Sequence, residues 1–392
     1  MKLIKNVNVV ALDKIIYNAC VETSGDKINR IFTTPVLDES VYVTIIDGKS
    51  QYLIPGFIDV HCHGGNGYDF LDATANEMKE ISDFYLQHGT TTLVPSSCAC
   101  SNEELVACFD QYAKYLEEND NSNLTGFHME GPYFSPAQCG AQNTDYFTKP
   151  NIEFLEDSIK KYPFITRISA APEVDEDYKL SKFCSKHGLV CGVAHTDANF
   201  SQIEEAMNNG YSVMTHLYSG MQGVHRVNAY RIAGAVEAGL YFDELYTEVI
   251  ADGKHLPTEL LKYIYKLKGA DKIIMVTDGT RASGLPDGGE TFVGTKTCGI
   301  PAIIEDGVAK LLDRKSFAGS ASSYDQIFKV MAKAIGGDFI AMAKMSSTNA
   351  AKLLGLFDRG EIAVGKKADL LIVNQNFEIE KIIYNGDIVK WN

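Results

Sequence analysis

The sequence predicts an α/β fold: a (β/α)8 barrel of the TIM type, with a small β-sandwich domain built from the N- and C-terminal segments. Two observations lead to this prediction. Strand-like and helix-like segments alternate through the middle of the chain, and both ends are rich in strand-forming residues without a helical period. A chain of 392 residues is long enough for one large barrel and a smaller domain.

The central alternation supplies the barrel. Its candidate strands are residues 57–61, 91–97, 124–130, 165–171, 190–196, 212–217, 248–252 and 273–278. Helical patterns lie between them at 75–89, 102–119, 179–188, 201–210 and 257–269, with a last one at 320–337. Several end in glycine, as helix C-termini do. No G-x-G-x-x-G motif follows the first strand, so a closed barrel is favoured over a nucleotide-binding open sheet.

The β-rich ends form the second unit of the prediction. Because chain termini often lie close together, the two ends are expected to pair in one small sheet structure. We therefore predict a β-sandwich domain from residues 1–54 together with 360–392, and a barrel from residues 55–359.

Composition excludes several classes of partner. The formal charge of −15, without any basic stripe, argues against nucleic-acid binding. No run of about 18 apolar residues is present, so no membrane-spanning helix is expected, and the N-terminus lacks the features of a signal peptide. The nine cysteines are scattered and include no Cys-x-x-Cys pair, which fits a reducing, cytoplasmic location.

Metal-binding residue types stand at the ends of the predicted strands, where the chemistry of such barrels is found. The stretch LIPGFIDVHCHGGNGYDFLD ends a strand with His61 and His63, which share one face because side chains alternate. A single His-x-His is more often only two polar residues at a strand end. Here the other strand ends add further candidates, namely Glu130, His195, His216, His255 and Asp278. Histidine, glutamate and aspartate converging on one cavity indicate a metal site.

Four other histidines are kept apart from this set. His88 and His187 each precede a glycine at a helix end, where a histidine faces the helix dipole or solvent. His128 shares the face of Glu130 one step deeper, either to support a ligand or as a hydrogen-bonded core residue. His225 stays unassigned.

Imidazole and carboxylate ligands suit zinc, with iron, manganese or cobalt as alternatives. Glu130, His195 and His216 could hold one ion. A second ion could lie between His61, His63, Asp278 and the other oxygen of Glu130. Metal coordination lowers the pKa of water to about 7, and Asp278 would take the proton of that water and deliver it to a leaving nitrogen. Hydrolysis of an amide or a related C–N bond is therefore predicted, with one or two ions per subunit.

Eight segments carry a resemblance to a known family. They are PGFIDVHCHG, GFHMEGPYFSP, GVAHTDA, THLYSGM, ADGKH, VTDG, FAGS and NAAKLLGL with the later GKKADLLIVN. In this order the chain resembles the amidohydrolase superfamily, and within it the N-acetylglucosamine-6-phosphate deacetylases. The strand-four segment ITRISAAP holds no lysine, whereas the dihydroorotase and hydantoinase branches have a metal-bridging lysine there. Glu130 takes that role in the deacetylases.

The resemblance implies removal of the acetyl group from an N-acetylated amino-sugar 6-phosphate. Glu130, His195 and His216 would be the principal metal ligands and Asp278 the general base. The implied substrate contacts are Gln142, Ser219, Gly220, Arg226, His255 and Phe317. Gln142 stands where some relatives have a histidine that polarises the substrate carbonyl, a role that an amide N–H can fill.

The departures from the family pattern lie around the phosphate site. THLYSGM replaces the usual THLYNAM, and the usual REPG that follows is missing. Arg226 is the best match for an arginine that in relatives reaches across a homodimer interface. Arg231 is second, and a solvated surface charge is the alternative for Arg226.

These departures leave other substrates open. They are N-acetylgalactosamine 6-phosphate, an unphosphorylated N-acetyl sugar, an N-acyl amino acid and a cyclic amide. A non-catalytic barrel retained for assembly is the alternative from another class.

Overall fold

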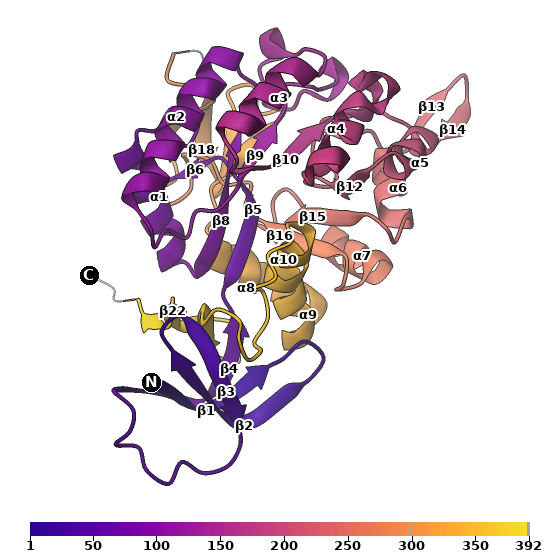
Figure 1. Cartoon of the computed structure of the whole chain (residues 1–392). Coiled ribbons are helices and arrows are strands. Elements are labelled where there is room, and N and C mark those ends of the chain that lie inside the picture. Colours follow the sequence, from indigo (N-terminus) through magenta and orange to yellow (C-terminus); the bar gives the residue numbers. More distant parts are fainter. Residues whose placement is uncertain (298, 390–392) are drawn as a thin grey trace.

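Eight parallel strands form the centre of the computed structural model, which describes residues 1–297 and 299–389 (Figure 1). In spatial order they run β16-β15-β12-β11-β10-β9-β8-β5. Asp278 N–H donates to the His61 carbonyl at 3.0 Å and His63 N–H to the Gly279 carbonyl at 2.7 Å, which brings the first and last strands together. The strands are β5 (Phe57–Cys62), β8 (Thr90–Ser97), β9 (Phe127–Glu130), β10 (Ile165–Ala170), β11 (Val190–Val193), β12 (Tyr211–Met214), β15 (Tyr246–Ile250) and β16 (Ile273–Val276).

Helices surround these strands (Figure 1). They are α1 (Ala75–Gln87), α2 (Asn102–Glu118), α3 (Ile152–Lys161), α4 (Lys179–His187), α5 (Phe200–Asn208), α6 (Ala235–Tyr241), α7 (Thr258–Lys268) and α8 (Tyr324–Ile335). The sequence patterns located six of them and missed α3 and α6. The seven-residue α6 is too short to show a helical period, and it contains Gly239, which packs so closely on Met214 that a Cβ would lie 2.9 Å from its Cγ.

Local capping sets where several helices begin. At α1, Thr74 Oγ1 accepts a hydrogen bond from Glu77 N–H, and the Glu77 carboxylate accepts one from Thr74 N–H at 2.7 Å. The same reciprocal pair joins Ser101 to Glu104 at the start of α2. Such pairs satisfy backbone donors that the first helical turn leaves unpaired.

After α8 the chain continues through α9 (Phe339–Ala343), the π-helical segment η5 (Lys344–Thr348) and α10 (Asn349–Leu353). This segment is anchored to the barrel strands. Asn349 Nδ2 donates to the Ile273 carbonyl at 2.7 Å, and Ser347 Oγ donates to the Gly56 carbonyl at 2.8 Å. It leads the chain from the barrel back to the terminal strands (Figure 1).

The two ends of the chain pair in a separate seven-stranded sheet, in the order β23-β22-β21-β4-β1-β2-β3. The sheet curls so that β3 lies beside the segment before β21. There Ile28 N–H donates to the Lys366 carbonyl at 2.9 Å, and Gly365 N–H donates to the Ile28 carbonyl at 2.8 Å. A core of its own lies inside this curl. The strands are β1 (Lys2–Val10), β2 (Ile15–Ser24), β3 (Lys27–Phe32), β4 (Thr44–Pro55), β21 (Leu370–Val373), β22 (Ile379–Tyr384) and β23 (Asp387–Ile388). The predicted fold class is confirmed, while the division at residues 54 and 360 stays a prediction.

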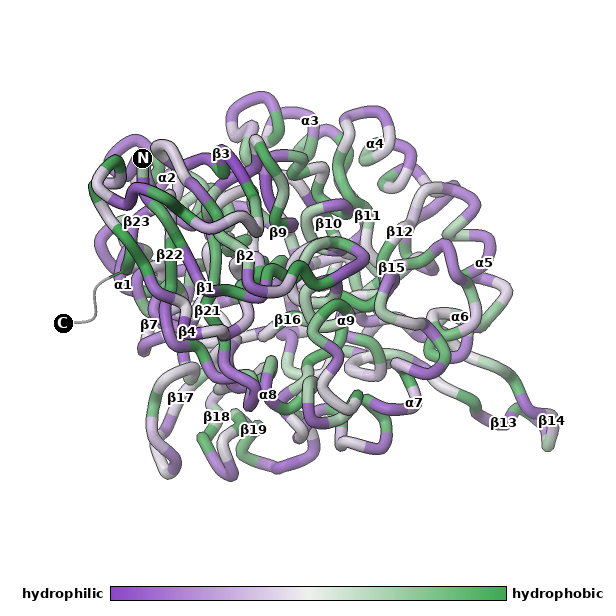
Figure 2. Tube along the Cα trace, turned by 90° about the horizontal axis from the view of Figure 1, so that it is seen from below, coloured by the Kyte–Doolittle hydropathy of each residue, from purple (hydrophilic) through white to green (hydrophobic). Residues whose placement is uncertain are grey.

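Two insertions were not predicted. A four-stranded sheet follows β16, and a hairpin projects from the body of the protein after β12 (Figures 1 and 2). Ser320 N–H donates to the Asp278 carbonyl at 2.9 Å, which ties the inserted sheet to the mouth of the barrel. The inserted strands are β17 (Glu290–Val293), β18 (Ile300–Glu305), β19 (Val308–Leu311) and β20 (Phe317–Ser320), and the hairpin is β13 (His225–Val227) and β14 (Tyr230–Ile232).

A short ribbon after β5 completes the strands: β6 (Gly64–Gly65) and β7 (Tyr68–Asp69). Within the described ranges, no helix combines the length and the apolar character that crossing a bilayer requires.

We expect Ile372→Ala to destabilise the protein by about 2–5 kcal/mol, because it opens a cavity in the core of the terminal sheet. Ile372 is 1% exposed and lies on β21 opposite Leu53 of β4. The control Val364→Ala changes a side chain that is 64% exposed, so its effect should stay within about 0.5 kcal/mol. Thermal unfolding measures both; equal melting temperatures would contradict the structural role of β21.

Candidate metal centre and active site

Three of the predicted site residues follow their strands at the same interval. His195, His216 and Asp278 stand two residues after the ends of β11, β12 and β16. All three have left-handed backbone conformations, with φ of 46°, 35° and 46°. Non-glycine residues rarely adopt this conformation, and it persists where the surrounding structure holds it, often at functional sites. The turn directs each side chain inward over the end of the barrel.

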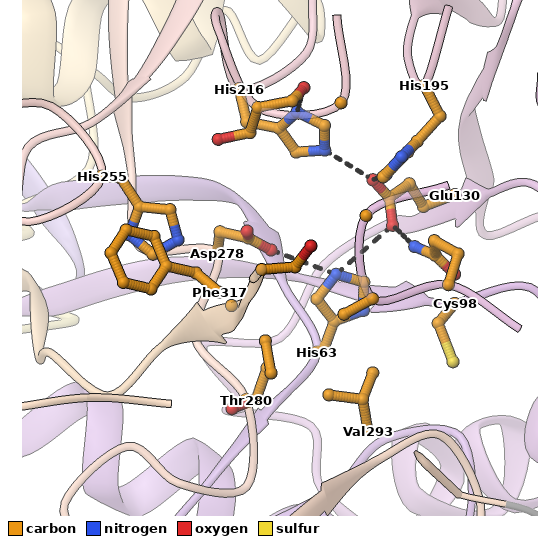
Figure 3. Close-up of a pocket in the computed structure, with 18 of the residues that line it drawn as sticks. His63, Cys98, Glu130, His195, His216, His255, Asp278, Thr280, Val293 and Phe317 are labelled. Carbon is orange, nitrogen blue, oxygen red and sulfur yellow. Dashed lines mark hydrogen bonds and ion pairs between the residues drawn. The ribbon is translucent and has the colours of Figure 1, made fainter. Parts of the chain in front are cut away.

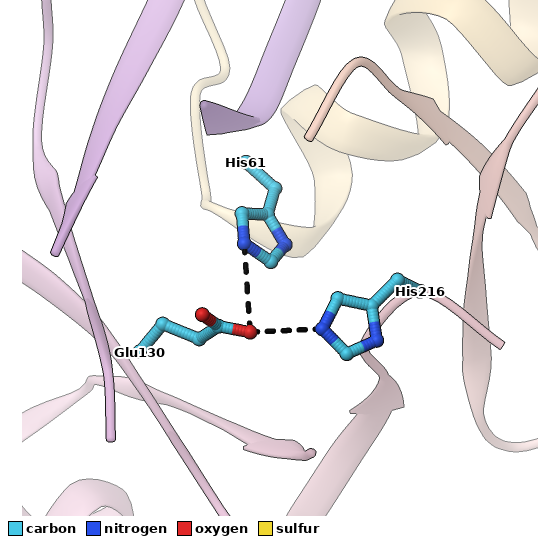
Figure 4. A group of neighbouring side chains, drawn as sticks. All are labelled: His61, Glu130 and His216. Atoms are coloured by element: carbon cyan, nitrogen blue, oxygen red, sulfur yellow. Dashed lines mark hydrogen bonds and ion pairs between the residues drawn. The ribbon is translucent and has the colours of Figure 1, made fainter. Parts of the chain in front are cut away.

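Glu130, the last residue of β9, stands at the centre of this gathering. Its Oε1 lies 2.8 Å from His216 Nε2, 3.3 Å from His195 Nε2 and 3.7 Å from His61 Nε2. Figure 4 shows the imidazoles of His61 and His216 facing the same carboxylate oxygen. Residues from four different strands therefore meet at one buried carboxylate that is 1% exposed.

His63 and Asp278 complete the gathering on the other side of His61. Asp278 Oδ1 lies 3.2 Å from His63 Nε2 and 3.5 Å from His61 Nε2. The two Nε2 atoms of His61 and His63 are 3.2 Å apart, and His63 Nε2 is 3.5 Å from Glu130 Oε2. The close approach of two ring nitrogens, both beside carboxylates, is the arrangement that a shared cation stabilises.

Among the residues that the structure describes, two groups have potential ligand atoms within 4.8 Å of one another: His61 with Glu130 and His216, and His61 with His63 and Asp278. His61 belongs to both. His195 approaches Glu130 from outside these groups, and its Nδ1 donates to the Gln138 carbonyl at 2.8 Å. The ring is thereby oriented with Nε2 toward Glu130. The donor set of imidazoles and carboxylates fits a divalent metal.

The electrostatics of the cluster keep its carboxylates ionised. Burial opposes ionisation of Glu130, but hydrogen bonds from His195 and His216 outweigh it and hold the pKa of Glu130 well below its usual range. For Asp278, burial also opposes ionisation, but the hydrogen bond from His63, together with the charge of that ring, outweighs it and lowers the pKa of Asp278 to about 2. Burial disfavours protonated His63, yet Asp278 and Glu130 raise the pKa of His63 to about 9. Anionic oxygens are therefore available to a cation at neutral pH.

A second layer of polar residues lies beneath the cluster, and apart from His128 it was not predicted from the sequence. Glu248 on β15 and Arg167 on β10 are both fully buried and form an ion pair. Burial would raise the pKa of Glu248, but the charge of Arg167 and the hydrogen bond from His61 lower it to about 2. Both residues fall within the predicted strands, and a charge inside an apolar strand was the signal that each has a buried partner.

His128 belongs to this layer. Its Nε2 lies 2.8 Å from Ser169 Oγ and its Nδ1 3.1 Å from Ser96 Oγ. The ring also packs edge-on against His61, with ring centroids 4.7 Å apart. Burial and the charge of Arg167 hold the pKa of His128 well below its usual range, so this histidine is a neutral, hydrogen-bonded core residue in contact with a candidate ligand.

The cluster opens into a cavity of about 300 Å³ (Figure 3). The inserted sheet contributes Val293 and Phe317 to its wall, and the loop after β12 contributes Ser219 and Gly220. The His255 ring lies 4.7 Å from the ring of Phe317, and its Nδ1 is 2.7 Å from Asp252 Oδ2. Five of the six predicted substrate contacts line this cavity: Gln142, Ser219, Gly220, His255 and Phe317.

Gln142 reaches the metal cluster directly. Its Nε2 donates to Glu130 Oε2 at 2.5 Å, and its Oε1 accepts a hydrogen bond from Ala99 N–H at 2.7 Å. The amide is thereby fixed with its N–H toward the ligands.

The sixth predicted contact, Arg226, lies on the projecting β13–β14 hairpin, where it is exposed and pairs across the ribbon with Arg231. Among the described residues that line the cavity, none is a lysine or an arginine. Within the described part of the chain, histidine rings but no guanidinium line this space.

The histidines that the sequence analysis set aside lie elsewhere. His88 Nδ1 is 2.9 Å from Asp325 Oδ1, and His187 Nε2 is 3.2 Å from Glu156 Oε1. His225 begins the projecting hairpin.

Comparison with known proteins decides the family. Residues 52–389 match the family model described as "Amidohydrolase family". The chain belongs to the amidohydrolase family. The resemblance read from the motifs is thus confirmed. Membership of this family implies a divalent metal, and the cluster around Glu130 has side chains that could hold one.

Similar proteins match nearly the whole chain. The N-acetylglucosamine-6-phosphate deacetylase of Bacillus subtilis (strain 168) is 30% identical over 98% of this chain and 96% of its own length. The crystal structure of the Thermotoga maritima N-acetylglucosamine-6-phosphate deacetylase superposes with a TM-score of 0.86, covers 100% of both chains and is 29% identical. The N-acetylgalactosamine-6-phosphate deacetylase of Escherichia coli O157:H7 is 25% identical over 90% of this chain and 92% of its own length.

We expect divalent ions to raise the melting temperature of the chelator-treated protein, because an ion that binds only the folded chain stabilises it, by about 2.7 kcal/mol at a hundred times its dissociation constant. Glu130→Gln should lose most of this gain, since the Glu130 carboxylate lies beside four imidazoles of the cluster. Glu156→Gln, on the surface beside Lys186, is the matched control and should keep it. An equal gain in Glu130→Gln would contradict metal binding at this cluster.

Proposed function

We propose that this protein is a metal-dependent deacetylase of an N-acetylated amino-sugar 6-phosphate, converting N-acetylglucosamine 6-phosphate into glucosamine 6-phosphate and acetate. The observation that carries this proposal is the gathering of four histidines and two carboxylates at one end of the barrel, beside a cavity lined by five of the six predicted substrate contacts. The names of the full-length relatives support the same reaction.

In this proposal Glu130, His195 and His216 hold one ion, and His61, His63 and Asp278 hold a second where it is present. Zinc is the proposed metal, with iron, manganese and cobalt as alternatives that the same ligands accept. When bound, a divalent ion lowers the pKa of water and polarises a carbonyl group.

Asp278 is the proposed general base and acid. It takes a proton from the attacking water and delivers it to the leaving nitrogen, which the free amine product requires. Its carboxylate lines the cavity and is ionised at neutral pH, so it can accept that proton. The Gln142 amide N–H, aimed at the ligands, donates to the substrate oxygen as negative charge develops.

His255 and Phe317 form the proposed wall against the sugar, and Ser219 with Gly220 faces the phosphate. A phosphate in this cavity meets no lysine or arginine of the same copy among the described lining residues. We propose that Arg226 from a second copy supplies that charge in a homodimer. Support comes from the projecting hairpin, on which Val227 and Tyr230 are 49% and 76% exposed beside Arg226. A phosphorylated substrate and the scattered cysteines fit a cytoplasmic location.

The galactosamine epimer is the second candidate substrate. Ser219 and Gly220 replace the asparagine and alanine of the usual motif at the wall of the cavity. A relative with 25% identity is named N-acetylgalactosamine-6-phosphate deacetylase.

Acetate release measures the reaction directly. The metal-loaded protein should release acetate from N-acetylglucosamine 6-phosphate with a higher kcat/KM than from its galactosamine epimer, and both should exceed the unphosphorylated sugars. Asp278→Asn should lower kcat by about 10²–10⁴-fold, because it removes the proton acceptor. No release from any of these sugars by the metal-loaded protein would remove the proposal. A higher kcat/KM for the galactosamine epimer would make that epimer the proposed substrate instead.

Arg226→Ala should raise KM for the phosphorylated sugar at least tenfold, because a charge-assisted contact with phosphate contributes about 1.5–3 kcal/mol. Arg231→Ala is the matched control on the same ribbon and should change KM little. Unphosphorylated sugars should show no difference between these variants. A protein that sediments as a monomer at full activity would contradict the contribution of a second copy.

A further inference from the structure

Glu248 supports the metal cluster from below without lining the cavity. It lies in the middle of β15, with its side chain 0% exposed. Arg167 on β10 pairs with its Oε1 through Nη1, and Arg167 Nη2 donates to Thr215 Oγ1 at 2.8 Å. The arginine thus joins β10, β12 and β15 and fixes the orientation of the carboxylate.

The second oxygen of Glu248 points toward the metal ligands. Its Oε2 lies 3.3 Å from His61 Nδ1. Because an ionised carboxylate only accepts hydrogen bonds, the proton of the neutral His61 ring is on Nδ1, and the lone pair is on Nε2. That Nε2 is the atom that faces Glu130 and Asp278, whereas the other ring nitrogen is turned away from Glu130 in Figure 4.

The same residue holds the end of β12. Glu248 Oε2 accepts a hydrogen bond from His216 N–H at 3.3 Å, and the Glu248 carbonyl accepts one from Leu217 N–H at 2.9 Å. His216 has a φ of 35°, a conformation that persists only where neighbouring groups hold it. Two hydrogen bonds to Glu248 therefore hold the backbone N–H groups on either side of the His216 Cα.

We propose that Glu248, oriented by Arg167, is the positioning residue of the metal centre: it selects the Nε2-metallating form of His61 and holds the turn that aims His216. The inference rests on the metal centre proposed above. Glu248 and Arg167 would then contribute to the affinity of the site for the metal ion, whereas a purely structural ion pair would affect only folding stability.

Zinc affinity of the metal-free protein, measured in competition with a chelator, tests the proposal. Glu248→Gln should weaken Zn²⁺ binding by about 10–100-fold, the usual effect of mutating the partner behind a metal-bound histidine, because a neutral amide is a weaker acceptor than a carboxylate. Asp175→Asn is the matched control, because Asp175 is also buried and hydrogen-bonded, to Leu180 N–H and Tyr211 Oη, but lies away from the cluster. It should lower the melting temperature and leave zinc affinity unchanged.

Glu248→Gln leaves Arg167 buried without its charged partner, which opposes folding. A second variant therefore tests the proposal if Glu248→Gln does not fold. Arg167→Met with Glu248→Gln removes both charges and retains an amide as the acceptor. It should fold and still bind Zn²⁺ at least tenfold more weakly than the unaltered protein. Zinc affinity equal to that of the unaltered protein, in either variant that folds, would overturn the proposal.

A double-mutant cycle with His61→Ala tests the route of the effect. The loss of zinc affinity caused by Glu248→Gln should shrink in the His61→Ala background, because the Nδ1 contact no longer exists there. An equal loss in both backgrounds would overturn the part assigned to His61. The readout is metal binding, so inactivity toward sugar phosphates would remove the proposed reaction and leave this result intact.

Discussion

The convergence of imidazoles on the Glu130 carboxylate is the interaction on which the rest of the site depends. Three histidines from three other strands place Nε2 atoms within 3.7 Å of one carboxylate oxygen. Buried charges are costly unless they are paired, so this cluster is stable only with its charges balanced by protons or by a cation. The barrel supplies the geometry because parallel strands bring their carboxyl ends to one rim.

The polar layer beneath the cluster explains how so many ionisable groups can be accommodated. Hydrogen bonds run from Glu248 through Arg167 to Thr215, and from Thr215 through Ser169 to His128. Each of these buried side chains has a hydrogen-bond partner on another strand or just after one, which limits the cost of placing it in the barrel interior. The layer therefore determines ring orientation above it as well as the packing of the strands.

The cavity depends on segments outside the regular barrel. The sheet inserted after β16 brings Phe317 against His255, and the turn after β12 brings Ser219 and Gly220 to the wall. These segments decide the shape of the substrate space, whereas the strand ends decide the chemistry. This division is usual for barrels of this class, in which loops vary and the strand framework is retained.

The sequence by itself determined the barrel and the pairing of the chain ends, and it predicted which histidines and acids gather at one rim. Strand-like runs ending in His61, Glu130 and His216 are local signals, and the topology of parallel strands places such ends together without further information. Only the tertiary structure decided the inserted sheet, the pair formed by Arg167 and Glu248, and the place of Arg226 outside the cavity of its own copy. These features depend on contacts between residues that are distant in the chain, such as Arg167 and Glu248, which are 81 residues apart. A sequence pattern does not show which distant residues lie close together in space.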